Sequence, residues 1–294
     1  MAGRLLIVAT PIGNLADLSD RAREALARAN VIAAEDTRHT GALLRTLGLK
    51  KPLVSLHEHN ESQRAAALLE RLAAGENVAL VSDAGTPLLS DPGFELVRRA
   101  VQAGVQVTAI PGPSAVTTAL ALAALPTDRF CFEGFLPARA SERRAALDAL
   151  AHEKRTLVFF EAPHRIVAAL EDMAAELGAA RQAVAARELT KAHETIYRGT
   201  LGELASRARA EANFARGEIT LVIAGAAAGV GAGAADPQLL RRLVQLLSKE
   251  LPPGRVAAIG AQLTGASRAE AYALAMQAAA GLTRQAKLRD EEMP

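Results

Sequence analysis

The stretch Val78–Leu125, VALVSDAGTPLLSDPGFELVRRAVQAGVQVTAIPGPSAVTTALALAAL, decides the fold class of this chain. It contains two consecutive strand–loop–helix units, in which the apolar runs Val78–Ser82 and Val105–Ile110 each end in a loop rich in Gly, Pro or Ser. A helix is predicted over Pro92–Ala103, closed by Gly104, and another follows the second loop. Strands that alternate with helices imply a parallel sheet with right-handed crossovers, whose ligands bind at its carboxyl edge. Both loops are therefore predicted to hold a small molecule.

The same alternation precedes this stretch. Three further strands are predicted over Leu5–Ala9, Val31–Ala34 and Leu53–Leu56, and Ser19 is a suitable N-cap for the first helix. The loops after the strands are polar or rich in Gly and Pro, whereas the returns from helix to strand are short. Because the carboxyl ends of parallel strands meet at one edge, this asymmetry predicts a functional edge on a first domain, residues 1–125.

A second α/β domain, residues 126–225, is predicted after a junction at Pro126–Arg129. Its sheet is expected to be mixed, and its strands are predicted over Phe130–Phe135, Thr156–Phe160, Ala183–Ala186, Glu194–Gly199 and Ile219–Ala224. The last two of these strands are predicted to form a hairpin-related pair on either side of a helix over Leu201–Ala212.

The carboxy-terminal part has a different composition. Residues 226–236 are almost only Ala and Gly, which is typical of a flexible linker. Residues 237–294 are predicted to form a small domain of three helices, with a helix-turn-helix link before a last helix over Ser267–Ala280, where Ser267 and Glu270 make a capping box. Residues 237–289 hold eight Lys and Arg against two Asp and Glu, which suits a nucleic-acid backbone. A packing or dimerisation appendage is the alternative.

The overall composition is that of a soluble globular protein with room for two domains. The 294 residues are 50% hydrophobic and 22% charged, and the formal charge of +2 permits an anionic partner without requiring one. The single cysteine, Cys131, excludes an intramolecular disulfide and is predicted to be a buried structural thiol. No signal peptide and no membrane span of about 18 apolar residues are recognisable. We therefore expect a cytoplasmic protein with no membrane partner.

The chemistry of the loops narrows the class of ligand. Neither TPIGN at residues 10–14 nor SDAGTPLLSDPG at residues 82–93 contains the lysine of a Walker loop, and the G-x-G-x-x-G spacing is absent. Their small residues expose backbone groups and allow close approach, as does PGPSA at residues 111–115. A ligand without phosphates, with an adenosine and an amino-acid part, would suit these loops. Tight turns without a ligand are the alternative.

Covalent and metal-dependent hydrolysis are disfavoured. No set of His, Cys and carboxylates has the spacing of a metal site, and no G-x-S-x-G elbow occurs. Four charged clusters follow strands, at residues 35–39, 58–61, 164–165 and 187–191. Each alone is typical of solvated loop charge, but four at the same kind of position favour catalysis.

Eight motifs, in this order, resemble the tetrapyrrole-methylase-like, or class III, S-adenosylmethionine-dependent methyltransferases, and among them those that act on ribosomal RNA. They are ATPIGNLADLSDRA, AEDTRHTGALL, LHEHNE, SDAGTPLLSDPG, IPGPSA, FEGFLP, EAPHR and ARELTKAHE. The resemblance is collinear over residues 4–225 and continues, less distinctively, into the helical tail. It implies an α/β fold of two α/β/α domains with S-adenosylmethionine in the cleft between them, and no metal.

The resemblance also implies an activity and partners. The reaction would be methylation of the ribose 2′-hydroxyl of one cytidine in the decoding centre of 16S rRNA, within the 30S ribosomal subunit, by a homodimer. The cofactor-binding residues that it implies are Pro11, Asp83, Ala84, Gly85, Leu88, Ser114, Ala115, Glu161, Ala162, Leu189 and Thr190. Where this chain has SDAGTPLL, tetrapyrrole methylases usually show a GGDP-type loop.

A ribose hydroxyl is a weak nucleophile, so a carboxylate or a neutral amine that takes its proton would accelerate methyl transfer. The candidates for this catalytic role are Glu188 and Lys191, with Asp36 behind them. The expected RNA contacts are Arg38, His39, Arg165 and Arg187.

Two other functions are alternatives. A tetrapyrrole C-methyltransferase would use the same cofactor, but a porphyrinoid needs a roomier and more apolar trough than the EDTRHT and EHNE loops offer. A non-catalytic regulator would combine a ligand-sensing α/β module with a DNA-binding helix-turn-helix. Polar residues at many strand ends favour catalysis over sensing.

Overall fold

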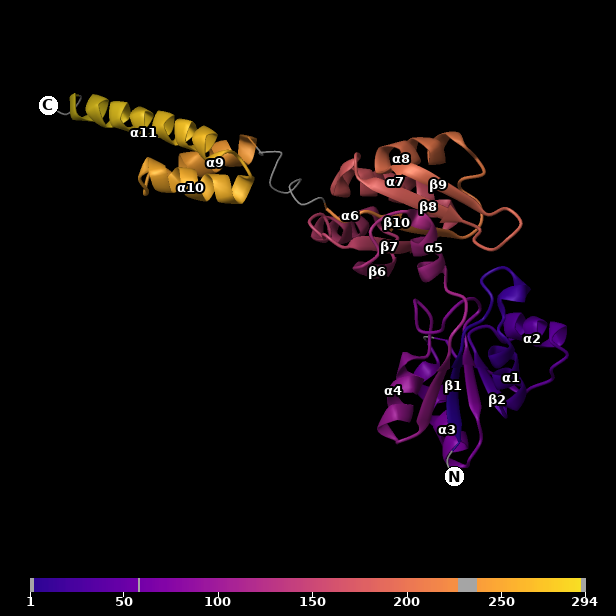
Figure 1. Ribbon diagram of the computed structural model, residues 1–294. Helices are drawn as coiled ribbons and strands as arrows, with labels where there is room; N and C mark the ends of the chain where they lie inside the picture. The colour runs from indigo at the N-terminus through magenta and orange to yellow at the C-terminus, as the bar shows by residue number, and fades with distance from the viewer. Residues whose placement is uncertain (1–2, 58, 227–236, 292–294) are drawn as a thin grey trace. The chain divides into compact units, whose positions relative to one another are not determined.

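The computed structural model describes residues 3–57, 59–226 and 237–291 (Figure 1). The described chain forms two compact units, an α/β unit that contains both sheets and a helical unit that contains the last three helices. Apart from residue 226, the predicted linker lies outside the described residues. Within the described ranges, none of the helices combines the length and the apolar character that a membrane span requires.

The first sheet has five parallel strands, as the alternating pattern predicted. In chain order they are β1 (Arg4–Val8), β2 (Val31–Ala34), β3 (Leu53–Ser55), β4 (Val78–Val81) and β5 (Gln106–Ile110). Their order in the sheet is β3-β2-β4-β1-β5. The strands β2 and β4 are buried along their whole length, because a parallel sheet is covered on both faces.

Helices cover both faces of this sheet. The helices α1 (Asp20–Arg28) and α2 (Thr37–Thr46) pack on one face, and α3 (Glu61–Ala73) and α4 (Phe94–Gln102) pack on the other. Ser19 caps α1 as predicted, since its hydroxyl accepts a hydrogen bond of 3.1 Å from the third amide of the helix. The five loops that follow the strands therefore lie at one edge of the sheet.

The second sheet is mixed, as predicted, with the order β6-β7-β10-β8-β9. Its strands are β6 (Phe130–Phe135), β7 (Thr156–Glu161), β8 (Gln182–Arg187), β9 (Thr195–Thr200) and β10 (Ile219–Ile223). The predicted pairing of the last two strands is wrong, because β10 lies between β7 and β8, and β9 pairs with β8. Every residue of β10 is buried, which suits a central strand, whereas β9 is partly exposed and lies at the edge.

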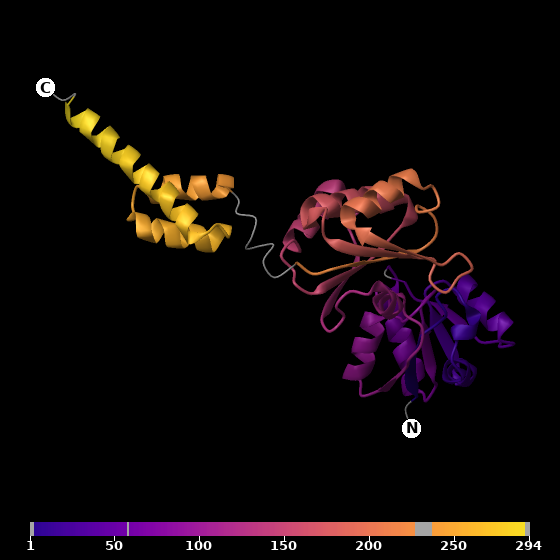
Figure 2. The same ribbon diagram turned by 45° about the horizontal axis from the view of Figure 1, so that its top comes forward.

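Three helices pack on one face of the second sheet, shown in pink to orange in Figures 1 and 2. They are α6 (Ala140–Ala149), α7 (Ile166–Met173), which continues into a π-helical turn, and α8 (Leu201–Ala210). Cys131 lies on the edge strand β6 and is half-buried, so its prediction as a buried thiol is wrong. An edge strand has a neighbouring strand on one side only, which leaves its side chains less covered.

The helix α5 (Ala115–Ala123) covers the opposite face of the second sheet. It follows β5 of the first sheet in the chain, yet its Val116 and Leu120 belong to the same buried cluster as Val158 and Val222 of the second sheet. The packing therefore changes from one sheet to the other before α5, whereas the sequence placed this helix in the first domain. A helix of this mostly apolar composition does not reveal from its periodicity which sheet it covers.

The helical unit contains α9 (Pro237–Leu247), α10 (Pro253–Thr264) and α11 (Arg268–Glu291). Leu240, Val256 and Ala271 form the centre of its own apolar core. One half of the predicted capping box is present, since the Ser267 hydroxyl accepts a 3.1 Å hydrogen bond from the Glu270 amide. The last helix extends beyond its predicted end, because good helix formers such as Gln, Ala, Lys, Leu and Arg follow Gly281 and no proline interrupts them.

Candidate functional site

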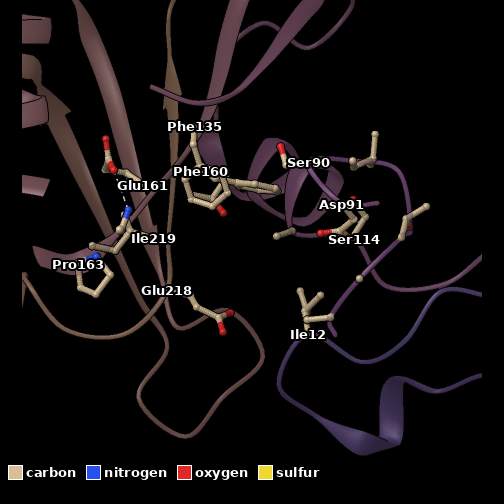
Figure 3. A pocket seen from close by; sticks show the side chains of 17 residues that line it. Ile12, Ser90, Asp91, Ser114, Phe135, Phe160, Glu161, Pro163, Glu218 and Ile219 are labelled. Carbon is tan, nitrogen blue, oxygen red and sulfur yellow. Dashed lines mark hydrogen bonds between the residues drawn. The ribbon is translucent and has the colours of Figure 1, made fainter. Parts of the chain in front are cut away.

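A cavity of about 340 Å³ lies at the carboxyl edge of the first sheet, against the second sheet (Figure 3). Its walls are mostly apolar, and both halves of the α/β unit contribute to them. The first half contributes Ile12, Ala84, Gly85, Thr86, Leu89, Ser90, Asp91, Ser114 and Ala115. The second half contributes Phe135, Phe160, Glu161, Ala162, Pro163, Glu218, Ile219 and Thr220.

Backbone hydrogen bonds fix the loop after β4 in this wall. The amide of Thr10 donates to the carbonyl of Gly85 at 2.9 Å, and the amide of Gly85 donates to the carbonyl of Thr10 at 3.0 Å. The Thr86 hydroxyl donates to the carbonyl of Pro113 at 3.2 Å, which ties the same loop to the loop before α5. Three loops from three strands are therefore joined around one side of the cavity.

The loops of the site contain four of the five described non-glycine residues with positive φ. They are Leu88 (77°), Ser90 (67°), Glu188 (53°) and Thr190 (64°). Such conformations cost free energy for residues with a side chain, and they are concentrated at binding and catalytic sites. The surrounding hydrogen bonds therefore impose these loop shapes at a cost in stability.

Glu161 is a buried carboxylate whose charge is balanced inside the protein. It ends β7, it is 2% exposed, and it accepts a 2.8 Å hydrogen bond from the Ala162 amide. Arg165 forms an ion pair with it, with 3.0 Å between Nε and Oε1 and 3.2 Å between Nη2 and Oε2. Arg165 thus contacts Glu161 and the Leu136 carbonyl, and its side chain is only 21% exposed.

A second charged cluster joins Glu188, Lys191 and Glu218. Lys191 Nζ lies 2.9 Å from Glu188 Oε1 and 3.3 Å from Glu218 Oε1, and the Glu218 amide donates to Glu188 Oε1 at 2.9 Å. Burial lowers the pKa of Lys191, but the hydrogen bond to Glu188 and the charges of both carboxylates outweigh burial and raise it. The hydrogen bond from Lys191 also holds the pKa of Glu188 below its ordinary value. Lys191 is therefore an ammonium group between two carboxylates.

Gly13 brings this cluster against the loop after β1. A Cβ atom on Gly13 would overlap Lys191 Cγ and would lie 3.0 Å from the Leu189 carbonyl oxygen. A residue without a side chain is therefore needed where residues 10–14 meet residues 189–191. Leu189 and Thr190 lie at this contact, Pro11 belongs to the same loop as Gly13, and none of the three lines the cavity.

Asp36 has a structural position at the start of α2. Its side chain accepts a 2.8 Å hydrogen bond from the Arg38 amide and pairs with Arg38 Nη2 at 2.7 Å. Its own amide donates to Asp83 Oδ1 at 3.0 Å, which links the ends of β2 and β4. The hydrogen bonds from Arg38 hold the pKa of Asp36 well below its usual range. A carboxylate with so low a pKa is a weak base.

The side chains that were predicted to contact RNA differ in their exposure and in their hydrogen bonds to the rest of the protein. Arg38 is 90% exposed beside Asp36, and the neighbouring His39 is exposed too. Arg187, in contrast, donates to the carbonyl of Arg216 at 2.7 Å and to that of His193 at 3.0 Å. Arg187 therefore stabilises two loops, whereas Arg38 presents its guanidinium to solvent.

Six of the eleven predicted cofactor-binding residues line the cavity, and the other five do not. Those that line it are Ala84, Gly85, Ser114, Ala115, Glu161 and Ala162. Asp83 and Leu88 belong to the same loop, outside the lining. Sequence reasoning did not single out Asp91, Phe135, Phe160 and Glu218, which also line it. The position of Phe135 and Phe160 at or next to the ends of strands was the one signal that could have pointed to them.

The described residues contain no group of three or more His, Cys, Asp and Glu side chains that could hold a metal ion. The apolar walls, the exposed backbone of the loops and the few charged groups are typical of a small-molecule site.

Two family models identify the class to which this fold belongs, the tetrapyrrole methylases. The family model of the Tetrapyrrole (Corrin/Porphyrin) Methylases matches residues 4–205, and that of the RsmI C-terminal HTH domain matches residues 233–279. The chain belongs to this methylase family and, within it, to the ribosomal RNA small subunit methyltransferase I family. The resemblance of the eight motifs is thereby confirmed.

Relatives support this assignment, and solved structures share the fold. The Ribosomal RNA small subunit methyltransferase I of Xylella fastidiosa (strain Temecula1) is 51% identical over 92% of this chain and 98% of the relative. That of Escherichia coli O157:H7 is 49% identical, over 94% and 95%. Among solved structures, the methyltransferase CobJ superposes with a TM-score of 0.58 at 22% identity, covering 77% of this chain and 95% of its own. Diphthine synthase superposes with a TM-score of 0.57 at 20% identity, over 76% and 90%.

Proposed function

We propose that this protein transfers a methyl group from S-adenosylmethionine to the ribose 2′-hydroxyl of one cytidine in the decoding centre of 16S rRNA. The proposal is supported by near 50% identity, over almost the whole chain, to relatives named for methylation of small-subunit ribosomal RNA. The observation that carries it in the molecule is the cavity at the sheet edge, with the cluster of Glu188, Lys191 and Glu218 at its border.

The cavity fits the parts of S-adenosylmethionine. Its volume of about 340 Å³ is in the range of small-molecule sites, roughly 300–1,000 Å³. Phe135 and Phe160 offer aromatic faces to an adenine ring, with their ring centres 5.5 Å apart. The first turn of α5, at Ser114 and Ala115, offers the partial positive charge of a helix N-terminus to a carboxylate. The absence of lysine in these loops agrees with a ligand that has no phosphate.

We assign the predicted cofactor residues to two layers. Ala84, Gly85, Ser114, Ala115 and the Glu161–Ala162 pair would contact the donor, because they line the cavity. Pro11, Asp83, Leu88, Leu189 and Thr190 would shape the loops that hold it. Bound there, S-adenosylmethionine supplies a methyl group on a cationic sulfur that is a good leaving group. Positioning of the acceptor should then provide much of the acceleration.

The acceptor would be activated by the charged cluster. As the ribose oxygen forms its bond to the methyl carbon, and the bond between that carbon and sulfur breaks, the hydroxyl proton has to leave. Glu218 is the carboxylate of the cluster that lines the cavity, so we assign it the role of proton acceptor. The Lys191 ammonium would stabilise the negative charge that develops on the oxygen, and Glu188 would hold Lys191 in place. Asp36 would act at a distance, by positioning Arg38 and Asp83.

RNA would be held by exposed cations. The exposed side chains of Arg38, which is paired with Asp36, and of His39 would contact phosphates, whereas Arg165 and Arg187 would act chiefly by ordering the loops around the site. Residues 237–289 carry a surplus of Lys and Arg, which supports a further contact with RNA by the helical unit. We further propose that the protein is cytoplasmic, because small-subunit ribosomal RNA is a cytoplasmic substrate. We also propose a homodimer, because the family resemblance implies one, and light scattering of the purified protein tests it.

A direct test supplies the purified protein with S-adenosylmethionine carrying an isotopically labelled methyl group. The acceptors compared are 30S particles from cells that lack the protein, naked 16S rRNA and a precorrin-type tetrapyrrole. We expect label in the RNA and none in the tetrapyrrole. Label in the tetrapyrrole alone would replace the proposal by C-methylation. Donor binding with no labelled product, together with sequence-specific binding to duplex DNA, would replace it by a regulatory role.

A further inference from the structure

Three carboxylates line the cavity, and their charges are balanced in different ways. Glu161 is paired with Arg165, and Glu218 is paired with Lys191. In the described part of the chain, Asp91 has no cationic partner. Figure 3 shows Asp91 beside Ser114 on the side of Ile12, away from Glu161 and Pro163 on the opposite side.

The surroundings of Asp91 make its negative charge unfavourable. It is half-buried in a mostly apolar cavity, and the neighbouring Ser82 offsets only part of the effect of burial on its pKa. The charged groups that act on its pKa are Glu35 at the end of β2 and Asp83 at the end of β4, and both are negative like Asp91 itself. Burial raises the pKa of Asp91 to about 6, and repulsion by Glu35 and Asp83 adds to the effect. A carboxylate in such a place gains from a positively charged neighbour.

S-adenosylmethionine carries charge at two places, of which one is neutral overall and the other has a net positive charge. Its amino-acid end holds an ammonium and a carboxylate, which compensate each other. Its sulfonium has no counter-ion within the molecule, and it lies between the adenosine and the amino-acid parts. A single unpaired carboxylate in the wall of an apolar cavity complements the sulfonium better than it complements a zwitterion.

We propose that Asp91 recognises the sulfonium charge of the methyl donor, and thereby makes the protein prefer the donor over its demethylated product, S-adenosylhomocysteine, whose sulfur is neutral. This inference rests on the proposed use of S-adenosylmethionine. It goes further, because it names the residue that senses whether the methyl group is still present. Loss of the charge after transfer leaves Asp91 without its partner and favours release of the product.

The test is calorimetric titration of the full-length protein with three ligands, without RNA. The ligands are S-adenosylmethionine, S-adenosylhomocysteine and sinefungin, which carries an ammonium group near the place of the sulfonium. The wild-type protein should bind both cationic ligands more tightly than the thioether. In Asp91→Asn, which keeps the shape of the side chain and removes its charge, the affinity for the cationic ligands should fall about tenfold, while that for the thioether changes little.

Asp128→Asn is the matched control, because it makes the same change at an exposed aspartate that does not line the cavity. It should leave the ratio of the two affinities unchanged. Thermal unfolding without ligand shows whether each variant is folded. If Asp91→Asn leaves the ratio of the affinities for the cationic and neutral ligands unchanged, the inference is overturned. Absence of any binding of S-adenosylmethionine by the wild-type protein would instead overturn the proposed function.

Discussion

Thr10 and Gly85 form an isolated antiparallel bridge, in which the amide of each donates to the carbonyl of the other at 2.9 and 3.0 Å. The bridge lies just beyond the ends of β1 and β4, two neighbouring strands of the first sheet. It joins the loop that contains Gly13 to the loop that contains Asp91. Main-chain hydrogen bonds therefore contribute directly to the shape of one wall of the cavity.

Gly85→Ala tests the importance of this bridge. Gly85 has a φ of 80°, and a Cβ atom there would lie 3.3 Å from Ile12 Cγ2, inside the cavity wall. We expect a loss of about 1–2 kcal/mol of unfolding free energy from the left-handed backbone, together with clearly weaker binding of S-adenosylmethionine. Gly104→Ala is the control, because Gly104 has a φ of 70° and nothing within 4 Å of its would-be Cβ. Equal donor binding by both variants would show that the bridge does not shape the site.

Lys191→Met and Glu188→Gln test the charged cluster. Because the cluster is proposed to act on the acceptor, turnover at saturating donor should fall about 100-fold or more in each variant, while the affinity for the donor changes little. Lys50→Met, at an exposed lysine, controls for the loss of a positive charge. Turnover is measured by transfer of labelled methyl groups to 30S particles. Undiminished turnover in both Lys191→Met and Glu188→Gln would refute the assignment.

Arg38→Ala and Arg187→Ala should separate binding from stability. Arg38 is exposed, so its loss should weaken RNA binding and reduce the slope of log affinity against log salt by about 1, with little change in unfolding. Arg187 holds two carbonyl groups, so its loss should cost about 1–3 kcal/mol of stability. Filter binding over a salt series and urea unfolding measure the two effects. The reverse pattern would exchange the roles of the two arginines.

Asp91 should make stability depend on pH. Its pKa in the folded protein is raised from 3.8 to about 6, so the folded state holds this proton more tightly than the unfolded state does. Its contribution is most favourable below the ordinary pKa and is lost as the pH rises through about 6. In the absence of donor, Asp91→Asn should therefore be more stable than the wild type at about pH 8, by about 1–2 kcal/mol after allowance for partial exposure. The difference should vanish at about pH 4, and a constant difference in urea unfolding would contradict the prediction.

The first sheet could be predicted from the sequence because its information is local. Runs such as Val78–Val81 are apolar throughout and end in Gly, Pro and Asp, which is typical of buried parallel strands. The pairing of β9 and β10 could not be predicted, because it depends on which strand fits between β7 and β8. The packing of α5 against the second sheet could not be predicted either, since its apolar side chains would suit either sheet.

For the candidate site, the sequence predicted the loops but not the contacts between their charged side chains. Loops at strand ends pointed to Gly85 and Ser114, which do line the cavity. The ion-pair partners of the charged side chains could not be predicted. Arg165 contacts Glu161 because of the local fold after β7. Lys191 contacts Glu218 because the strands β8 and β10 are neighbours in the sheet. For the same reason, the lack of a cation beside Asp91 becomes visible only in three dimensions.

The central claim is the methylation of one ribose in small-subunit ribosomal RNA, and mass spectrometry of nucleosides from that RNA tests it most directly. The RNA is compared between cells with the protein, cells without it, and cells complemented with Lys191→Met. We predict that one 2′-O-methylated cytidine of the 16S rRNA decoding centre disappears with the protein, and that the variant does not restore it. An unchanged set of methylated ribose nucleosides in the cells without the protein would contradict the account.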